Sequence, residues 1–157
     1  MEDLTRLLRE LPFFTDMPAE DLAEIVGCAV NERFPAGLYL FHEGEPADRF
    51  YIVREGRVAL ELYVPSKGAL SVDSVETGEI VGLSWLFSPH RWQMDARAVT
   101  DLRVIAIDGA CLRDKCDADP RLGYDLMQRL SRVAQQRMQS ARLRLLDLYG
   151  RAGSPVQ

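Results

Sequence analysis

Few side chains in this sequence have the types and spacing that catalysis requires. Gly82-Leu83-Ser84 places a serine between a predicted strand and a predicted helical turn, as in the nucleophile elbow G-x-S-x-G. Leu86, however, stands where the second glycine of that motif belongs. His90 is the one histidine downstream of the serine, and no acidic residue is spaced to pair with it. The sequence therefore disfavours a hydrolase, and we expect no catalytic residue and no enzyme activity.

The histidines and cysteines do not follow the spacing of a metal site either. The chain contains three cysteines, at positions 28, 111 and 116, and two histidines, His42 and His90, without a C-x-x-C or C-x-x-H motif. Cys111 and Cys116 are five residues apart on a predicted helix, about 140° round its axis, so they do not share a face. We expect no metal site, and reduced, buried thiols that pack as small apolar side chains.

The bulk composition is that of an ordinary folded domain. A chain of 157 residues with 47% apolar residues can bury a core of its own. It has no run of about 18 apolar residues that would predict a membrane span, and its first residues lack the apolar stretch of a signal peptide. We expect one domain over residues 1–150, located in the cytoplasm, with no membrane partner.

The hydrophobic pattern changes along the chain from helical to extended and back. Leucines at helical spacing predict a helix over 2–10, and a second helix is predicted to start at Asp16 or Pro18 and to end near Gly27 or Val30. From 31 to 107, short alternating segments with turns about every ten residues are typical of a sandwich or roll. Residues 82–89 predict one helical turn before the strands resume at Trp92, and Asp108 is predicted to cap a short helix.

A long helix is predicted over about residues 121–149, after Pro120. At roughly 40 Å it is longer than the core of one domain needs, so part of its apolar face should meet a partner. Six residues with heptad-like spacing form this seam: Leu130, Ala134, Met138, Ala141, Leu145 and Leu148. We predict a parallel homodimer through the seam, the alternative being a helix that lies back on the strands. Residues 151–157 are predicted to form a disordered tail.

Charge is concentrated in the same helix. The whole chain carries a net charge of -5, whereas residues 119–150 contain six arginines and three aspartates. A basic helix on an acidic body could meet DNA or an acidic partner, although a solvated helix face is the commoner arrangement.

Several motifs occur in an order that identifies a family. LPFFTDMPAEDL is followed by HEGEPADRFYIV, Glu55-Gly56, Gly78-Glu79 and Arg97-Ala98, and then by two helices. Over about residues 11–148 this order resembles the cyclic nucleotide-binding domain family of catabolite activator-type regulators, cyclic nucleotide-dependent kinases and gated channels. The resemblance implies an α+β fold: a double-stranded, jelly-roll-like β-roll with N-terminal helices, a cassette helix and a long C-terminal dimerisation helix.

The resemblance also locates the candidate ligand cassette, and there the sequence departs from the family. In the family, a Gly-Glu pair opens the cassette helix, and an arginine about nine residues after the glutamate pairs with the cyclic phosphate. Here Leu83 stands at the glutamate position and Trp92 at the arginine position. Arg91 is one residue early, which on a strand would point it to the opposite face. The candidate pocket residues are Gly82, Leu83, Ser84, Trp85, His90, Arg91, Trp92 and Gln93.

The resemblance implies a non-catalytic sensor that binds cyclic nucleotide only weakly or binds another small anionic ligand, and that passes occupancy to a partner through its last helix. No other cofactor is expected. The alternatives are a ligand-free interaction module with the same fold and a truncated sensor half of a transcription regulator. In the transcription factors a helix-turn-helix domain follows the long helix, whereas this sequence stops at Gln157, so we expect no direct sequence-specific DNA binding.

Overall fold

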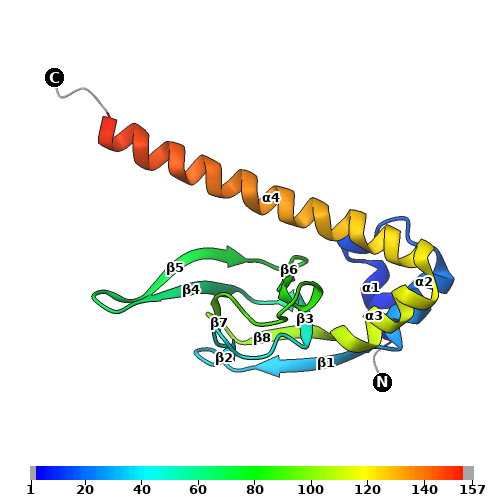
Figure 1. The fold of residues 1–157 in the computed structure, drawn as a ribbon. Helices are drawn as coiled ribbons and strands as arrows, with labels where there is room; N and C mark the ends of the chain where they lie inside the picture. Colours follow the sequence, from blue (N-terminus) through cyan, green and yellow to red (C-terminus); the bar gives the residue numbers. More distant parts are fainter. Residues whose placement is uncertain (1–2, 154–157) are drawn as a thin grey trace. The chain divides into compact units, whose positions relative to one another are not determined.

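The computed structural model of the chain describes residues 3–153. It divides into two compact units, one reaching Gly123 and the other beginning at Tyr124. The first unit holds the N-terminal helices, all the strands of the described chain and helix α3 (Figure 1). The second unit consists of most of helix α4, Pro120–Gly153.

The N-terminal segment forms three short helical elements. They are α1 (Leu4–Arg9), the 3-10 helix η1 (Pro12–Phe14) and α2 (Ala19–Val26). The carboxylate of Asp3 caps α1 by accepting the backbone N–H of Thr5 at 3.0 Å. Leu22 and Ile25 point from α2 into the core and are almost fully buried. The two helices predicted from leucine spacing are therefore confirmed, with shorter bounds.

Eight strands form two antiparallel four-stranded sheets within the described residues. The strands are β1 (Ala29–Phe34), β2 (Tyr39–Phe41), β3 (Arg49–Glu55), β4 (Val58–Val64), β5 (Gly68–Val75), β6 (Ile80–Val81), β7 (Asp95–Ala98) and β8 (Leu102–Asp108). One sheet has the order β1-β8-β3-β6 and the other the order β2-β7-β4-β5. The predicted α+β fold with a double-stranded roll is confirmed.

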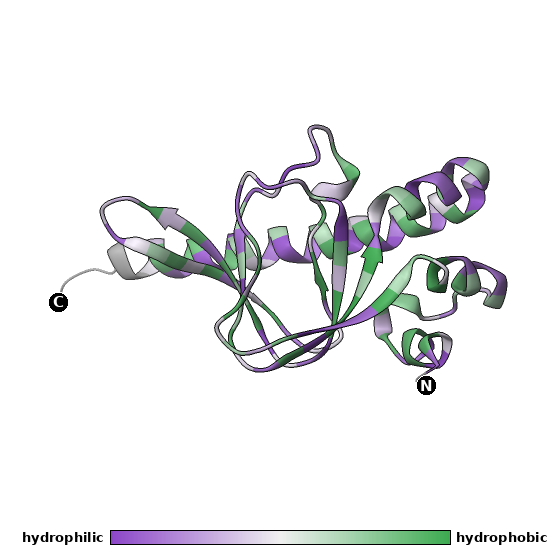
Figure 2. Cartoon of the chain, turned by 90° about the horizontal axis from the view of Figure 1, so that it is seen from below, coloured by the Kyte–Doolittle hydropathy of each residue, from purple (hydrophilic) through white to green (hydrophobic). Residues whose placement is uncertain are grey.

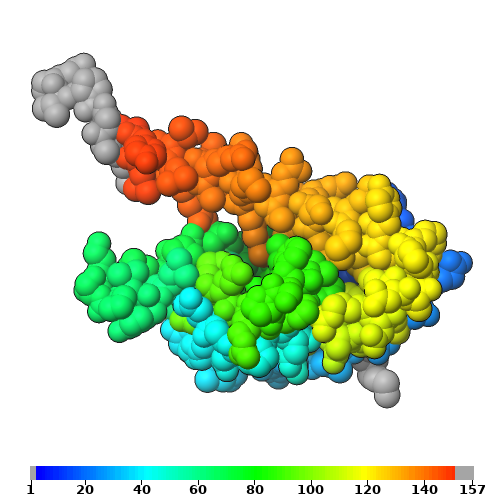
Figure 3. All heavy atoms as spheres, viewed as in Figure 1, coloured from blue at the N-terminus to red at the C-terminus, as the bar shows by residue number. Residues whose placement is uncertain are grey.

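The core lies between the two sheets. Val53 and Val104 contribute from the first sheet, and Leu60 and Ala96 from the second, all almost completely buried. The strands carry both hydrophobic and hydrophilic residues (Figure 2), and β3 and β4 each bury four consecutive residues. The β4–β5 hairpin extends beyond this core, and its tip stands out from the roll in the space-filling view (Figure 3). There Tyr63 is 63% exposed.

Two helices follow the roll. Helix α3 (Gly109–Ala118) is capped by Asp108, whose carboxylate accepts the backbone N–H of Cys111 at 2.8 Å, as predicted. Helix α4 begins at Pro120 and ends at Gly153, four residues beyond the predicted end. It therefore includes the first three residues of the predicted disordered tail, and residues 154–157 lie outside the described part of the chain.

The cysteines differ from the prediction. Cys28 and Cys111, 83 residues apart, form a disulfide with their Cα atoms 5.7 Å apart, whereas both were expected as reduced thiols. Among the described residues Cys116 is the free cysteine, and it is partly buried. Spacing along the chain could not indicate this pair, because the roll folds between the two residues and brings the end of α2 next to the start of α3.

Among the helices in residues 3–153, none combines the length and the apolar character that a membrane crossing requires.

Candidate functional site

The predicted cassette connects β6 to β7. Gly82 directly follows β6, and the 3-10 helix η2 (Ser84–Leu86) supplies the expected helical turn. The next regular strand begins at Asp95, three residues later than predicted. Residues 87–94 form an irregular loop, which meets residues 44–47 through isolated backbone hydrogen bonds and the bridge between Pro46 and Arg91. Trp92 therefore lies in a loop, where the alternation rule for strands does not set the direction of its side chain.

Trp92 is part of the core of the roll. Its side chain is 5% exposed, and it stacks on Phe41 with ring centroids 3.7 Å apart and an angle of 7° between the rings. Its backbone is held on both sides: its N–H donates to the carbonyl oxygen of Glu45, and its own carbonyl oxygen accepts the N–H of Gly44. The indole at the predicted phosphate-arginine position thus fills space between the sheets.

Gly82 is shaped to accommodate this indole. Its φ of +100° lies in the region that favours glycine. A β-carbon at residue 82 would come within 2.6 Å of two ring atoms of Trp92, closer than van der Waals contact permits. The glycine that opens the cassette is therefore required here by the tryptophan as well as by the turn.

Trp85 anchors η2 to the rest of the unit. Its side chain is fully buried and stacks on Phe50 with ring centroids 4.9 Å apart. The carbonyl oxygen of Trp85 accepts a hydrogen bond from Arg113 Nη1 at 2.5 Å, which ties the cassette to α3. The indole Nε1–H of Trp85 is buried without an acceptor among the described residues.

The polar residues predicted to line the pocket do not converge on one point. The guanidinium of exposed Arg91 donates from Nη1 to the carbonyl oxygen of Gly44 at 2.8 Å. His90 has a φ of +56°, and its carbonyl oxygen accepts the N–H of Ala47. Gln93 is exposed, while Leu83 and Ser84 are half-buried. Arg91 and His90 thus fasten the cassette loop to the β2–β3 connection.

Sequence reasoning missed a buried ionic cluster on the outer face of the second sheet. Glu61 on β4 is 4% exposed; it accepts hydrogen bonds from Tyr39 Oη at 2.8 Å and from Arg97 Nε at 2.9 Å. The hydrogen bond to Glu61, with burial and the carboxylate charge, raises the pKa of Tyr39. The separate hydrogen bond from Arg97 to Glu61 raises the pKa of Arg97. Because the three residues come from β2, β4 and β7, only the strand order reveals the cluster.

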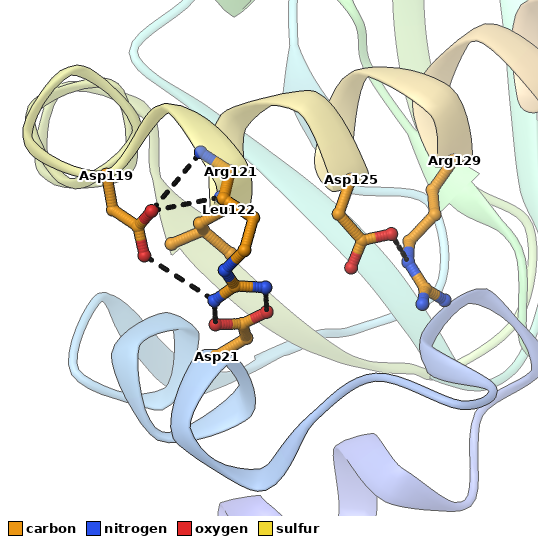
Figure 4. A network of polar contacts seen from close by, with 6 residues as sticks. All are labelled: Asp21, Asp119, Arg121, Leu122, Asp125 and Arg129. Atoms are coloured by element: carbon orange, nitrogen blue, oxygen red, sulfur yellow. Dashed lines mark hydrogen bonds and ion pairs between the residues drawn. The ribbon is translucent and has the colours of Figure 1, made fainter.

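A second missed ion pair joins α2 to the first turn of α4 (Figure 4). Arg121 donates from Nη2 and Nη1 to the two carboxylate oxygens of Asp21 at 2.5 and 3.0 Å. Asp21 is 2% exposed, and its hydrogen bond raises the pKa of Arg121. Asp119 precedes Pro120 and accepts the N–H of Arg121 at 3.2 Å, so it caps the helix. Asp125 and Arg129 form an ion pair along α4 itself.

The seam residues of α4 differ in exposure. Leu130 is 3% exposed, whereas Met138, Leu145 and Leu148 are 53, 53 and 61% exposed. Two exposed residues of α4 lie at heptad spacing before Ala134: Met127, which is 37% exposed, seven residues before it, and Ser131 three residues before it. Both line a surface depression of the helix. The exposed face therefore has an unbroken heptad pattern, in which Met127 and Ser131 replace Leu130. These seven residues are called the α4 seam below: Met127, Ser131, Ala134, Met138, Ala141, Leu145 and Leu148.

With the roll and its cassette established, comparison with known proteins identifies the family. The model of the cyclic nucleotide-binding domain matches residues 31–119, which include all eight strands except the first two residues of β1. The chain belongs to the cyclic nucleotide-binding domain family. Members of this family include regulatory proteins such as transcriptional regulators and kinase regulatory subunits.

Individual relatives agree with this assignment. A protein of Geobacter metallireducens GS-15, assigned to the cyclic nucleotide-binding proteins, is 31% identical, with a TM-score of 0.78, and the match covers 87% of this chain and 99% of that one. The N-terminal domain of a Streptomyces coelicolor transcriptional regulator is 27% identical, with a TM-score of 0.68, covering 86% of this chain and 94% of that domain.

A curated relative is the CRP-like cAMP-activated global transcriptional regulator of Mycobacterium tuberculosis, 28% identical over 73% of this chain and 50% of that protein. A potassium channel protein of Rhodopseudomonas palustris is matched over 35% of its length. The chain thus spans half or less of these two curated relatives.

Proposed function

We propose that this chain is a non-catalytic regulatory domain in which Trp92 stands at the position of the family's phosphate-binding arginine. Cyclic nucleotides therefore bind weakly. The observation that supports this proposal is the stack of Trp92 on Phe41 inside the roll, 5% exposed. A nucleotide that reached the same region would have to displace the indole from the core. It would find the apolar side chain of Leu83 where the family has a carboxylate for the ribose hydroxyl.

The absence of the phosphate-binding arginine should lower the affinity for cyclic nucleotides substantially. The family's arginine–phosphate contact is a charge-assisted hydrogen bond, worth about 1.5–3 kcal/mol. Its absence alone weakens binding by roughly one to two decades. Arg91 is next to the phosphate-arginine position, but its guanidinium is already bound to the carbonyl oxygen of Gly44. Compensation by Arg91 would therefore require the β2–β3 connection to release it.

For output, we propose a parallel homodimer through the α4 seam. The seam has the 4-3 spacing of a coiled coil, and its small residues Ser131, Ala134 and Ala141 allow two helices to approach closely. Exposed Leu145 and Leu148 would become buried in such a pair. A regulated protein partner would then read the position of the paired helices, in the cytoplasm, where we expect the chain to act.

Tryptophan fluorescence tests the proposed function, because Trp92 and Trp85 are the two tryptophans of the chain. Titration with cAMP or cGMP should leave the emission unchanged up to about 100 μM, since a weak ligand cannot displace a stacked, buried indole. Saturable quenching or a red shift at low micromolar nucleotide would show that the cassette opens readily, and the proposal would be wrong. A Trp85→Phe variant assigns any change to Trp92.

A second candidate function is the binding of a different small ligand. It is favoured by the buried Nε1–H of Trp85, which lacks an acceptor among the described residues. A buried donor without a partner costs free energy that an acceptor oxygen of a ligand would recover. Native mass spectrometry of the chain purified from its own host tests this candidate. A bound small molecule would support it, and a mass equal to that of the bare chain would favour the ligand-free interaction module.

A further inference from the structure

Helix α2 is joined to the segment that leads into α4 at three successive points. Asp21 pairs with Arg121, Glu24 with Lys115, and Cys28 with Cys111. Asp21, Glu24 and Cys28 are spaced by three and four residues, so they follow one face of α2 and its continuation. Their partners follow in reverse order along α3 and the first turn of α4. All six residues belong to the first unit.

The disulfide is the only covalent connection of the three. The other two are ion pairs with an exposed partner: Arg121 is 59% exposed, and Glu24 is 56% exposed. The exposed Glu24–Lys115 pair contributes little to holding two elements together, and salt weakens it. Arg121 binds a buried carboxylate with both terminal nitrogens, but it fixes the start of α4. The cross-link at Cys28–Cys111 is the connection of the three that lies at the first turn of α3.

The two cysteines of the disulfide differ in exposure. Cys28 is 7% exposed, whereas Cys111, in the first turn of α3, is only half-buried. Of the two cysteines, Cys111 is therefore the one that solvent reaches more readily. Backbone hydrogen bonds hold the region in place independently of the sulfurs: Asp108 N–H donates to the carbonyl oxygen of Cys28, and Gly109 N–H to that of Asp48. These bonds help to keep the chain folded after reduction, while the first turn of α3, no longer cross-linked, becomes more mobile.

We propose that Cys28 and Cys111 form a redox-reversible latch, which fixes α3 to α2 when oxidised and releases the first turn of α3 when reduced. A dithiol reductant of the cell would attack the sulfur of Cys111, breaking the Cys28–Cys111 bond and forming a mixed disulfide. The second thiol of the reductant then displaces Cys111. Two electrons and two protons pass to the protein, which gains two thiols, and the reductant becomes a disulfide.

The third cysteine does not take part in this exchange. Cys116 lies five residues beyond Cys111 on α3, about 140° round the helix. Burial, followed by the charges of Asp117 and Asp119, raises the pKa of the Cys116 thiol. It is therefore a poor nucleophile at neutral pH. Cys116 is a natural control for the pair.

The latch goes beyond the ligand proposal, because none of its residues belongs to the cassette. Its effect would reach the cassette through Arg113, which binds the carbonyl oxygen of Trp85 from the same helix α3. It would reach the output helix directly, since Asp119 and Pro120 connect α3 to α4. The redox state of one disulfide would then set the mobility of the connection on which a helix-based output depends.

The test uses the full chain equilibrated in glutathione buffers of increasing reduced-to-oxidised ratio. Thiol counting after denaturation should rise from one to three across this series, with Cys116 reactive throughout. Hydrogen exchange of the α3 amides should accelerate at least tenfold on reduction, and the melting temperature should fall by about 10 °C because an 83-residue loop is no longer closed. A Cys116→Ser variant should respond in the same way.

A Cys28→Ala/Cys111→Ala variant should exchange like the reduced chain in every buffer. Three thiols in all buffers would show that the disulfide does not form in solution, and one thiol in all buffers would show that it is not reversible; either result overturns the proposal. Equal α3 exchange in the oxidised and reduced chains would also overturn it. These measurements require no ligand, so their failure is independent of the cassette proposal.

Discussion

The indole of Trp92 lies directly against Gly82, so close that a β-carbon at residue 82 would be 2.6 Å from two of its ring atoms. The same indole also stacks on Phe41. In this cassette the glycine and the tryptophan are therefore interdependent, and each restricts what the other position can become.

Gly82→Ala should be strongly destabilising, because it adds a clash with the indole to the cost of a positive φ. Gly37→Ala is the matched control: Gly37 has a similar φ of +92°, but nothing lies within 4 Å of its β-carbon position. We expect Gly82→Ala to lower the free energy of unfolding by about 1–3 kcal/mol more than Gly37→Ala does. Urea denaturation measures both. Equal losses would mean that Trp92 moves aside at no cost.

Tyr51 should make the stability depend on pH in alkaline solution. Burial raises the pKa of this phenol to about 12, from 10.0 in the unfolded chain. Below pH 10 the phenol is neutral in both states; between pH 10 and 12 it ionises only when unfolded, so the free energy of unfolding falls by about 2–3 kcal/mol over this range. Denaturation at successive pH values measures the fall. A Tyr51→Phe variant with the same slope would contradict the assignment.

Glu61→Ala should lower the free energy of unfolding by about 1–3 kcal/mol, because it removes the shared acceptor of Tyr39 and Arg97 from a buried site. Glu76→Ala is the matched control. Glu76 meets Arg57 Nε at the same 2.9 Å, but its side chain is 46% exposed instead of 5% for Glu61. We expect less than about 1 kcal/mol for the control. Thermal denaturation measures both losses. An equal loss in the two variants would mean that burial does not strengthen the interactions of Glu61.

Leu145→Glu should prevent dimerisation, because it places a charge in the α4 seam. Leu143→Glu should not, since Leu143, 57% exposed compared with 53% for Leu145, lies off the seam. Sedimentation velocity distinguishes the two variants. Sedimentation of the unaltered chain as a monomer at about 100 μM would contradict dimerisation through the α4 seam.

The β-roll could be predicted from the sequence because the signals that indicate it are local. Turn glycines and the Asp108 cap depend on neighbouring residues, and the structure confirms both, whereas burial does not alternate along β3 and β4, each of which buries four consecutive residues. Leu83 and Trp92 could likewise be assigned to the family's glutamate and arginine positions by counting residues along the cassette. The structure alone shows that Trp92 turns inward onto Phe41, because the loop after η2 does not follow the period of a strand.

Long-range pairs were the part that the sequence could not supply. Asp21 and Arg121 are 100 residues apart, and Cys28 and Cys111 are 83 apart. Their types are compatible with many partners, and only the path of the chain through two sheets selects one. The expectation of three reduced thiols failed for this reason. The dimer seam stays a prediction; within it, the periodicity did not distinguish buried Leu130 from the exposed residues of the helix.

Restoring the family's two anchors tests the central proposal most directly. Calorimetry should detect no saturable cAMP binding to the unaltered chain below about 100 μM. The Leu83→Glu/Trp92→Arg variant should bind at least tenfold more tightly, by roughly the value of a charge-assisted contact. A Trp92→Phe variant keeps an aromatic ring and should behave like the unaltered chain. One-to-one binding of cAMP to the unaltered chain with a low-micromolar Kd would contradict the account.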